Sequence, residues 1–323
     1  MIMNNNLFKT LLIPAAACLL GACAERMDLN METGGESGAI RFAGPAVTRA
    51  AIDDADGMLT EGNSFSVWGN YTNKVSGSAT SVFNAEKVTY VSSMWGYEGT
   101  RYWLPGNIYD FYALYPSVET LGRNVAYVAC TNGNFVINGF DVTAGHDLDL
   151  MTAEQTNISV EQEVPGSVAL TFHHLLARIS FTARSEGGNA TVNSISLEGL
   201  AVKGAYDSSA EPPWSDTEMG TISVKKETPV TPAEKADVSG DLLLIPQSLT
   251  GGVTLTVTYD TDAETGKTAS YTLPTATVSE WTAANHYRYS FTLTGGGYIV
   301  FDPPTVNAWS DAIGGNVTID VTE

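Results

Sequence analysis

The sequence predicts an all-β protein, and three observations lead to that fold class. Apolar and polar residues alternate with a period of two in many segments, no segment keeps a helical period over three turns, and Gly, Asn, Pro and Asp interrupt the chain at short intervals. At 323 residues the chain is long enough for two domains, each with its own core. We therefore expect antiparallel β-sandwiches whose strands have one apolar and one solvated side.

The composition describes a folded, acidic and thinly charged protein. Hydrophobic residues make up 43% of the chain and charged residues only 16%, so we do not expect a disordered chain. The formal net charge is −20. Such a charge argues against nucleic acid as a partner, because the phosphate backbone would be repelled.

Residues 1–22 have the layout of a signal peptide. A polar start with Lys9 precedes an apolar stretch, 11–20, which is too short to span a membrane permanently. The segment Leu20–Cys23 (LGAC) resembles the lipobox of bacterial lipoproteins, in which a peptidase cuts before the cysteine and the thiol receives a lipid. We expect Cys23 to be lipidated and to carry acyl chains such as palmitate. An ordinary secretory signal with a coincidental cysteine is the alternative.

Residues 23–49 are expected to form a tether or prosegment, rich in Gly, Glu, Ser and Asn, with one short strand. Ile40 and Phe42 alternate with Arg41 there, so we expect Ile40 and Phe42 to face a core and Arg41 to face solvent. Arg49 follows this strand in a loop-like stretch of small residues, where proteases cut. We therefore predict proteolytic processing at Arg49.

Four later runs, 65–71, 109–115, 253–259 and 287–293, place apolar residues at every second position. Each run reads as a half-buried strand. The residues that we expect to be buried on their apolar sides are Phe65, Val67, Phe111, Leu255, Val257, Tyr289 and Phe291.

The polar segment 161–166, which ends in Pro165 and Gly166, is the best candidate for a domain boundary. We predict an N-terminal sandwich over residues 50–166 and a C-terminal sandwich over residues 167–323. The alternation changes phase between His173 and Leu175, which a β-bulge or a sharp bend would explain. The Pro-rich stretch 227–239 is expected to be a long loop.

We find no motif for catalysis, a metal or a cofactor. The four histidines lack a spacing suited to zinc, and His173 and His174 should point to opposite faces of a strand. Cys130 is expected to be a small buried residue rather than a nucleophile. The acidic clusters at 53–57 and 260–264 depart from the calcium-loop pattern. Solvated turns are the better interpretation, with adventitious calcium at the second cluster as the alternative.

Six tryptophans could form a platform for sugar stacking, but tryptophans in sandwiches more often fill cores. We expect core positions for all of them except Trp214, which follows Pro212 and Pro213 and is expected in an exposed loop. A glycosidase pair of carboxylates could be hidden among the many acidic residues.

An ordered set of motifs resembles a known family. The motifs are the lipobox Cys23, Val47–Ala50 (VTRA), Phe65–Gly69 (FSVWG), Tyr102–Gly106 (YWLPG), Tyr109–Ala113 (YDFYA), Phe172–Ile179 (FHHLLARI), Leu244–Gln247 (LIPQ), Tyr287–Tyr289 (YRY) and Val306–Trp309 (VNAW). In this order they resemble the fimbrillin-like proteins (type V pilins), which are lipoprotein pilins of anaerobic Gram-negative bacteria, over nearly the whole chain.

The resemblance implies two tandem transthyretin-like antiparallel β-sandwich domains and export as an outer-membrane lipoprotein to the cell surface or a fimbrium. It also implies cleavage between Arg49 and Ala50 by an arginine-specific protease, which would remove the strand with Ile40 and Phe42. Other fimbrial subunits would then bind by donor-strand exchange, and a host or bacterial surface ligand is a further candidate partner.

The predicted function is therefore a structural fimbrial subunit or a fimbrium-associated adhesin, without an active site. A non-polymerising surface lipoprotein that binds glycan or a host ligand is the second hypothesis. An undetected hydrolase is the third.

Overall fold

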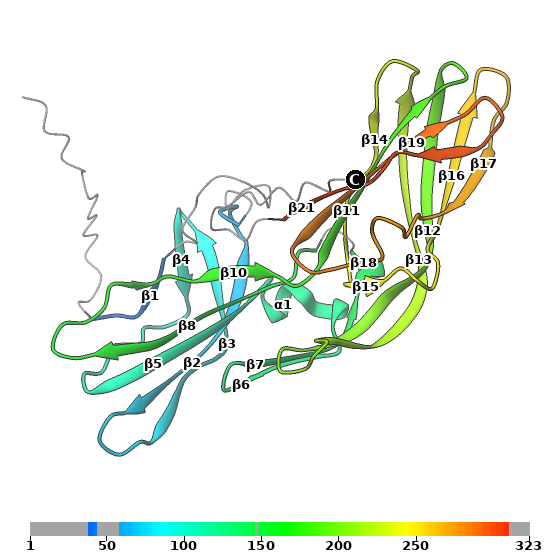
Figure 1. Cartoon of the computed structure of the whole chain (residues 1–323). Helices are drawn as coiled ribbons and strands as arrows, with labels where there is room; N and C mark the ends of the chain where they lie inside the picture. Colours follow the sequence, from blue (N-terminus) through cyan, green and yellow to red (C-terminus); the bar gives the residue numbers. More distant parts are fainter. Residues whose placement is uncertain (1–37, 44–57, 146–147, 310–323) are drawn as a thin grey trace, which may run out of the picture. The chain divides into compact units, whose positions relative to one another are not determined.

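The structure, a computed structural model, describes residues 38–43, 58–145 and 148–309 (Figure 1). These residues form β-strands connected by turns, together with one short α-helix, α1 (Val118–Leu121), and two short 3-10 helices, η1 (Gly122–Asn124) and η2 (Val142–Ala144). The predicted all-β class is thus confirmed. None of the helices in the described ranges is long and apolar enough to cross a membrane.

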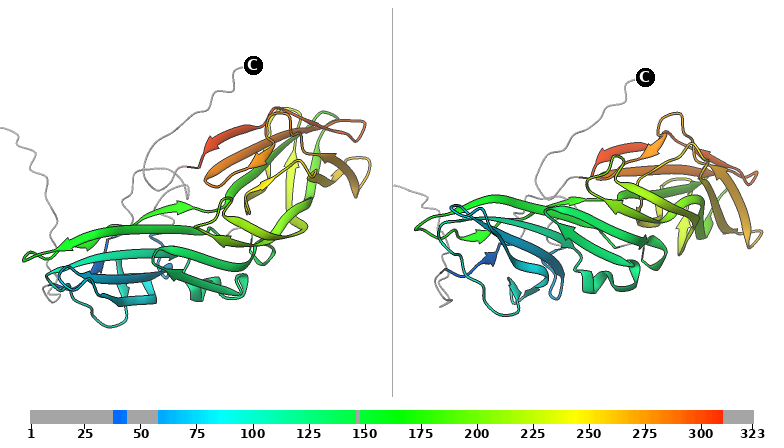
Figure 2. Two further views of the ribbon diagram at one scale, coloured as in Figure 1. Left: turned by 60° about the horizontal axis from the view of Figure 1, so that its bottom comes forward. Right: turned by 90° about the horizontal axis from the view of Figure 1, so that it is seen from below.

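The first sheet has eight strands in the order β10-β8-β5-β2-β3-β4-β1-β9, and Figure 2 shows it in blue to green from two further directions. Its strands are β1 (Arg41–Phe42), β2 (Ser64–Asn73), β3 (Ala79–Val91), β4 (Met94–Tyr97), β5 (Asn107–Tyr115), β8 (Met151–Val160), β9 (Ser167–Val168) and β10 (Thr171–His174). β9 and β10 lie at opposite ends of this order, yet only residues 169–170 connect them. The three steps from Val168 to Thr171 span at most about 10 Å, so the sheet must curl round on itself.

The inner face of the first sheet is lined by aromatic side chains. Phe65, Phe83 and Phe111 are almost completely buried, and Val67 lies beside them. The predicted burial of Phe65, Val67 and Phe111 is therefore confirmed. The period-two pattern sends alternate residues of β2 and β5 to the opposite face, where Trp68 and Tyr112 pack against a second cluster.

Two further sheets enclose the second core. One has the order β17-β16-β12-β7-β6, with β13 also paired to β12, and the other has the order β14-β11-β19-β20, with β21 also paired to β19. A two-stranded sheet of β15 and β18 accompanies them. The predicted burial of Leu255, Val257, Tyr289 and Phe291 is confirmed, since each is fully inaccessible to solvent. The bounds of these strands are β6 (Tyr127–Thr131), β7 (Asn134–Asp141), β11 (Ala177–Ser185), β12 (Ala190–Asp207), β13 (Trp214–Val230), β14 (Ala236–Leu244), β15 (Gln247–Ser248), β16 (Thr254–Thr261), β17 (Lys267–Thr272), β18 (Glu280–Trp281), β19 (Asn285–Leu293), β20 (Ile299–Phe301) and β21 (Thr305–Ala308).

Strand β12 is long enough to pair with different partners along its length. Its first half pairs with β16 and its second half with β7, while β13 runs along its other side. The hairpin of β6 and β7, residues 127–141, therefore belongs to the sheet of β12. Strands β9 and β10, residues 167–174, belong to the first sheet instead. The division into domains at residue 166 stays a prediction.

Two sequence expectations about the second half were wrong. The stretch 227–239 is mostly strand, since β13 ends at Val230 and β14 begins at Ala236. β13 pairs with β12 alone and is therefore an edge strand. Pro229 is tolerated there because its missing N–H can lie on the side without a neighbouring strand.

Trp214 is not in an exposed loop. It begins β13, is only 8% exposed, and its indole Nε1 donates to the Leu175 carbonyl oxygen at 3.2 Å.

The change of phase between His173 and Leu175 marks a passage between sheets. β10 ends at His174 in the first sheet, and β11 begins at Ala177 in the second core. Residues before and after this passage belong to different sheets, so their inward-facing positions follow different alternations. His173 is exposed and His174 is buried, as the alternation predicts.

Gly69 in β2 provides a test of the first core. A Cβ at this position would lie 2.8 Å from Cδ1 of Phe111 and 3.1 Å from Cδ2 of Phe83, both of them ring atoms without room to retreat. We expect Gly69→Ala to lower the free energy of unfolding by about 1 to 3 kcal/mol, as overpacking does. The measurement is urea unfolding followed by circular dichroism.

Gly96→Ala in β4 is the matched control, because a Cβ there would meet nothing within 4 Å. Equal unfolding curves for the two variants would contradict the close packing of Phe83 and Phe111 around Gly69.

Candidate functional site

The short strand β1 fills a position between two other strands of the first sheet. It runs antiparallel to β4, with Phe42 opposite Trp95, and parallel to β9, with Arg41 opposite Ser167 and Phe42 opposite Val168. β1 is therefore an interior strand of the order and is paired on both sides.

The side chains around β1 point as the sequence predicts. Ile40 is 1% exposed and Phe42 is 5% exposed, whereas Arg41 faces solvent. The ring of Phe42 makes edge contacts at 5.8 Å to Phe65, 5.6 Å to Phe83 and 5.9 Å to Phe111, measured between ring centroids. Phe42 thus completes the aromatic centre of the first core. That the strand can be removed stays a prediction.

Backbone hydrogen bonds fix this segment at both ends. Ile40 N–H donates to the Arg101 carbonyl oxygen at 2.8 Å, and Ala43 N–H donates to the Val168 carbonyl oxygen at 2.9 Å. Trp103 N–H donates to the Gly38 carbonyl oxygen at 2.9 Å, next to an isolated bridge between Ala39 and Tyr102. Residues 38–43 therefore bond to the 101–103 loop and to β9.

Tyr97 and Arg101 support the segment from the side of β4. The Tyr97 hydroxyl donates to the Ile40 carbonyl oxygen at 2.8 Å, and burial raises the pKa of Tyr97, which keeps this donor protonated. The Arg101 guanidinium lies over the rings of Phe83 and Tyr97 and forms an ion pair with Glu86 at 2.6 Å. It holds the loop whose carbonyl oxygen accepts from Ile40. Neither residue could be predicted from a local pattern, because Tyr97 and Arg101 contact partners that are distant along the chain.

Without β1 the first core would have a groove open to water. Ile40 and Phe42 would leave an apolar slot floored by aromatic rings, and β4 and β9 would each present an unpaired edge. The indole Nε1 atoms of Trp95 and Trp103, close to this slot, already lack a hydrogen-bond partner within the described part of the chain. A vacated position of this kind is suited to accept another extended strand by β-augmentation.

Only some of the other predicted site residues belong to the part of the chain that the structure describes. Cys23, Arg49, Ala50 and the acidic cluster 53–57 lie outside the described residues, so their roles stay predictions. Cys130 is half-buried, and burial raises its pKa to about 11. Its thiol is therefore protonated at neutral pH and is a poor nucleophile.

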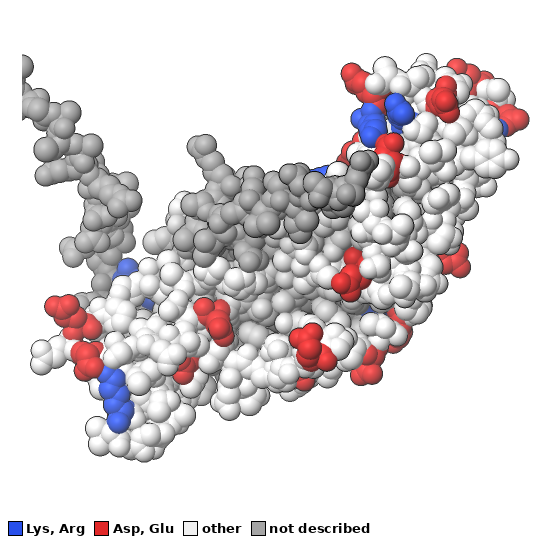
Figure 3. Space-filling view, in the orientation of Figure 1, with Lys and Arg blue, Asp and Glu red and all other residues white. Residues whose placement is uncertain are grey.

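Histidines and acids do not form a metal centre in the described ranges. His174 bonds through Nδ1 to Asp149 at 3.0 Å and stacks on Trp309, while His173 lies on the other face of the strand. Acidic side chains are spread over the face drawn in Figure 3. No group of three or more His, Cys, Asp or Glu among residues 38–43, 58–145 and 148–309 could hold a metal ion. The acidic turn at 262–266 joins β16 to β17, and Lys267 pairs with Glu264 there.

Comparison with known proteins identifies relatives of this fold. A family model described as fimbrillin-like matches residues 48–309. A fimbrial protein from Bacteroides vulgatus is similar in structure, with a TM-score of 0.61 and 17% identity over 84% of this chain and 100% of that one. A proposed cell adhesion protein from Bacteroides uniformis gives a TM-score of 0.51 and 20% identity over 84% of this chain and 98% of that one. No curated protein sequence matches the chain.

The hydroxyl of Tyr97 provides a test of how β1 is held. Tyr97→Phe leaves the Ile40 carbonyl oxygen without its side-chain donor, so we expect a loss of about 1 to 3 kcal/mol in the free energy of unfolding. Amide hydrogen exchange at Ile40 and Ala43 should accelerate as well. Tyr127→Phe is the control, because the Tyr127 side chain is 56% exposed and bonds to no described residue. Unchanged exchange at Ile40 in Tyr97→Phe would show that the hydroxyl does not hold the strand.

Proposed function

This chain belongs to the fimbrillin-like family, and we propose that it is a fimbrial subunit or fimbrium-associated adhesin that joins neighbouring subunits by exchange of β-strands. Family membership implies a place at the cell surface or in a fimbrium and association with other fimbrial subunits. The observation that carries the strand-exchange proposal is β1, a short strand paired on both sides whose two apolar side chains lie in the core.

The energetics of β1 suit a placeholder strand. Burial of Ile40 and Phe42 contributes roughly 3 to 6 kcal/mol, and each backbone hydrogen bond adds about 1 kcal/mol. β1 contributes only two residues to the ladder. A longer donor strand that fills the same groove would make more ladder bonds and bury more apolar side chains.

Before cleavage, the covalent link between β1 and the rest of the chain favours β1 as the strand that occupies the groove. While residues 44–57 connect β1 to the rest of the chain, binding of β1 is intramolecular and outcompetes a strand from another molecule. We propose that cleavage between Arg49 and Ala50 by an arginine-specific protease removes this advantage. The prosegment can then dissociate, and the free groove accepts the donor strand of another subunit.

Export and anchoring complete the proposal. We propose that residues 1–22 direct export, that Cys23 becomes acylated with palmitate or a similar chain, and that the lipid holds the uncut protein at the outer membrane. The tandem transthyretin-like description of the two sandwiches is part of the same proposal. No enzymatic activity and no cofactor is included in it.

The lipid anchor is tested at Cys23. We expect Cys23→Ala to lose incorporation of radiolabelled palmitate and to leave the membrane fraction, because no other thiol lies at the end of the apolar run. Cys130→Ala is the control and should label like the parent. Continued labelling and membrane fractionation of Cys23→Ala would contradict lipidation at this residue.

The processing step is tested with limited trypsin digestion. We expect the first cut to give a new N-terminus at Ala50, followed by polymers that electron microscopy and size-exclusion chromatography detect. Arg49→Ala should stay uncut at this position and monomeric under the same conditions. Arg123→Ala, which removes an exposed arginine in η1, should be cut and should polymerise like the parent.

Two outcomes would overturn the processing step. One is an Arg49→Ala protein that polymerises like the parent after trypsin. The other is a first cut within residues 58–309.

A further inference from the structure

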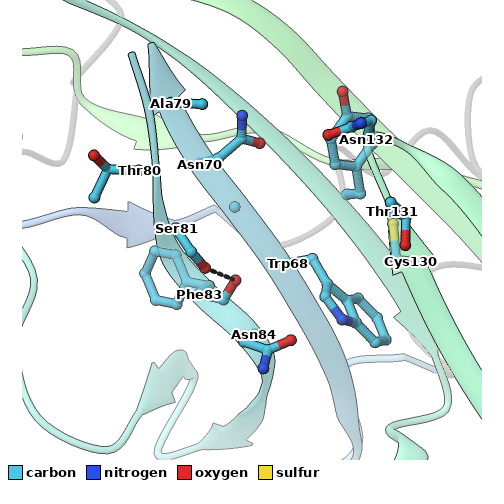
Figure 4. A pocket seen from close by; sticks show the side chains of 12 residues that line it. Trp68, Asn70, Ala79, Thr80, Ser81, Phe83, Asn84, Cys130, Thr131 and Asn132 are labelled. Atoms are coloured by element: carbon cyan, nitrogen blue, oxygen red, sulfur yellow. Dashed lines mark hydrogen bonds between the residues drawn. The ribbon is translucent and has the colours of Figure 1, made fainter. Parts of the chain in front are cut away.

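A pocket of about 260 Å³ lies on the face of the first sheet that is turned away from its aromatic core. Figure 4 shows β2 and β3 along one side of the pocket and Cys130, Thr131 and Asn132 on the other side. Residues from four strands and one turn therefore meet here. The pocket is complete within a single chain.

The lining of the pocket is polar but uncharged. No Asp, Glu, Lys, Arg or His is among the residues that line it. The polar groups include the amides of Asn70, Asn84 and Asn132 and the hydroxyls of Thr80, Ser81, Thr131 and Tyr112.

Most of these polar groups are free to bind a ligand. The side-chain amides of Asn70, Asn84 and Asn132 make no hydrogen bond to any residue in the described ranges, and only Ser81 is engaged, with the Phe83 carbonyl oxygen at 3.4 Å. Each amide offers both a donor and an acceptor, and each hydroxyl can act as either. The pocket thus gathers several solvent-accessible donors and acceptors that are not taken up by other described side chains in one small volume.

Aromatic residues give the pocket an apolar part that is fixed in place. Trp68 is held by an edge contact with Phe135 at 5.5 Å, and burial raises the pKa of Tyr112, so its hydroxyl stays protonated. The turn between β6 and β7 rests on Tyr112, since a Cβ at Gly133 would lie 2.5 Å from Cε1 of that ring. A larger residue at Gly133 would push this wall away.

Strand β3 departs from regular geometry where it borders the pocket. Its register against β2 shifts between Val67 and Gly69 and again between Gly69 and Asn70, and Ala85 adopts a φ of 54°. Both shifts place extra residues on β3. Bulges of this kind bend a strand, re-aim its side chains and occur often beside binding sites.

We infer that this pocket binds a neutral saccharide. A sugar ring presents many hydroxyls that each need a donor or an acceptor, and its C–H face packs against aromatic carbon atoms; amides, hydroxyls and aromatic rings supply both. The chain carries a net charge of −20, and Asp110 and Glu154 act electrostatically on Tyr112 at the pocket wall. An anionic sugar would therefore be repelled. The pocket has room for about one ring, so it would take a terminal or branching residue of a glycan.

The test is saturation-transfer difference NMR, followed by titration calorimetry, on the full-length chain before any proteolysis. The probes are galactose, mannose, N-acetylglucosamine and lactose, with sialyllactose as the anionic comparison. We expect transfer to at least one neutral sugar and weaker transfer to sialyllactose. Because the chain is unpolymerised, a failure of strand exchange would leave this result unaffected.

Three variants locate the binding in the pocket. Asn70→Ala and Asn84→Ala should each raise the dissociation constant about tenfold, which corresponds to one lost hydrogen bond of typical strength. Thr131→Trp, at an exposed position of the hairpin, should fill the pocket and abolish binding. Asn189→Ala, an exposed asparagine outside the pocket, should bind like the parent. Circular dichroism checks that each variant is folded.

Three results would overturn the inference. They are the absence of transfer to every neutral sugar, equal affinity for lactose and sialyllactose, and parental affinity in both Asn70→Ala and Thr131→Trp.

Discussion

The insertion of Phe42 among Phe65, Phe83 and Phe111 is the contact on which the first core depends. These three rings come from β2, β3 and β5, and the curled sheet brings them together around one point. Phe42 reaches that point from a separate segment, 38–43, whose own ladder is only two residues long. The core therefore includes a side chain from a segment that contributes little to the sheet by itself. The ladder of the sheet therefore depends little on which strand fills the position of β1.

Local patterns predicted the strands and the direction of their side chains. Period-two alternation identified the inward residues Phe65, Phe111 and Tyr289, because each side chain position follows from its own neighbours. Pairing partners could not be predicted in this way. β1 bonds to the 101–103 loop and to β9, and β7 pairs with β12, all across long stretches of sequence. Trp214 was misassigned for the same reason: its Pro-Pro context is local, whereas the Leu175 carbonyl oxygen that binds it is distant.

In the candidate sites, too, local patterns predicted the direction of side chains but not their distant partners. Ile40 and Phe42 were predictable as inward residues, and they lie in the core. Tyr97 and Arg101, which hold them, had no local signature. The saccharide pocket is still further from what a sequence can reveal, since single asparagines and threonines on three strands and one turn carry no motif. Only the two register shifts in β3 bring Asn84 and Ser81 to the same side as Asn70.

The direction of β1 has a consequence for the shape of an assembly. β1 runs parallel to β9 and antiparallel to β4, so a strand that reuses the same backbone hydrogen bonds must run the same way. A groove on one copy and a strand on the next are different surfaces, and contacts between different surfaces are heterologous. Heterologous contacts that do not close into a ring continue indefinitely. A fibre built through this groove would therefore have two unlike ends, one with an empty groove and one with an unused strand.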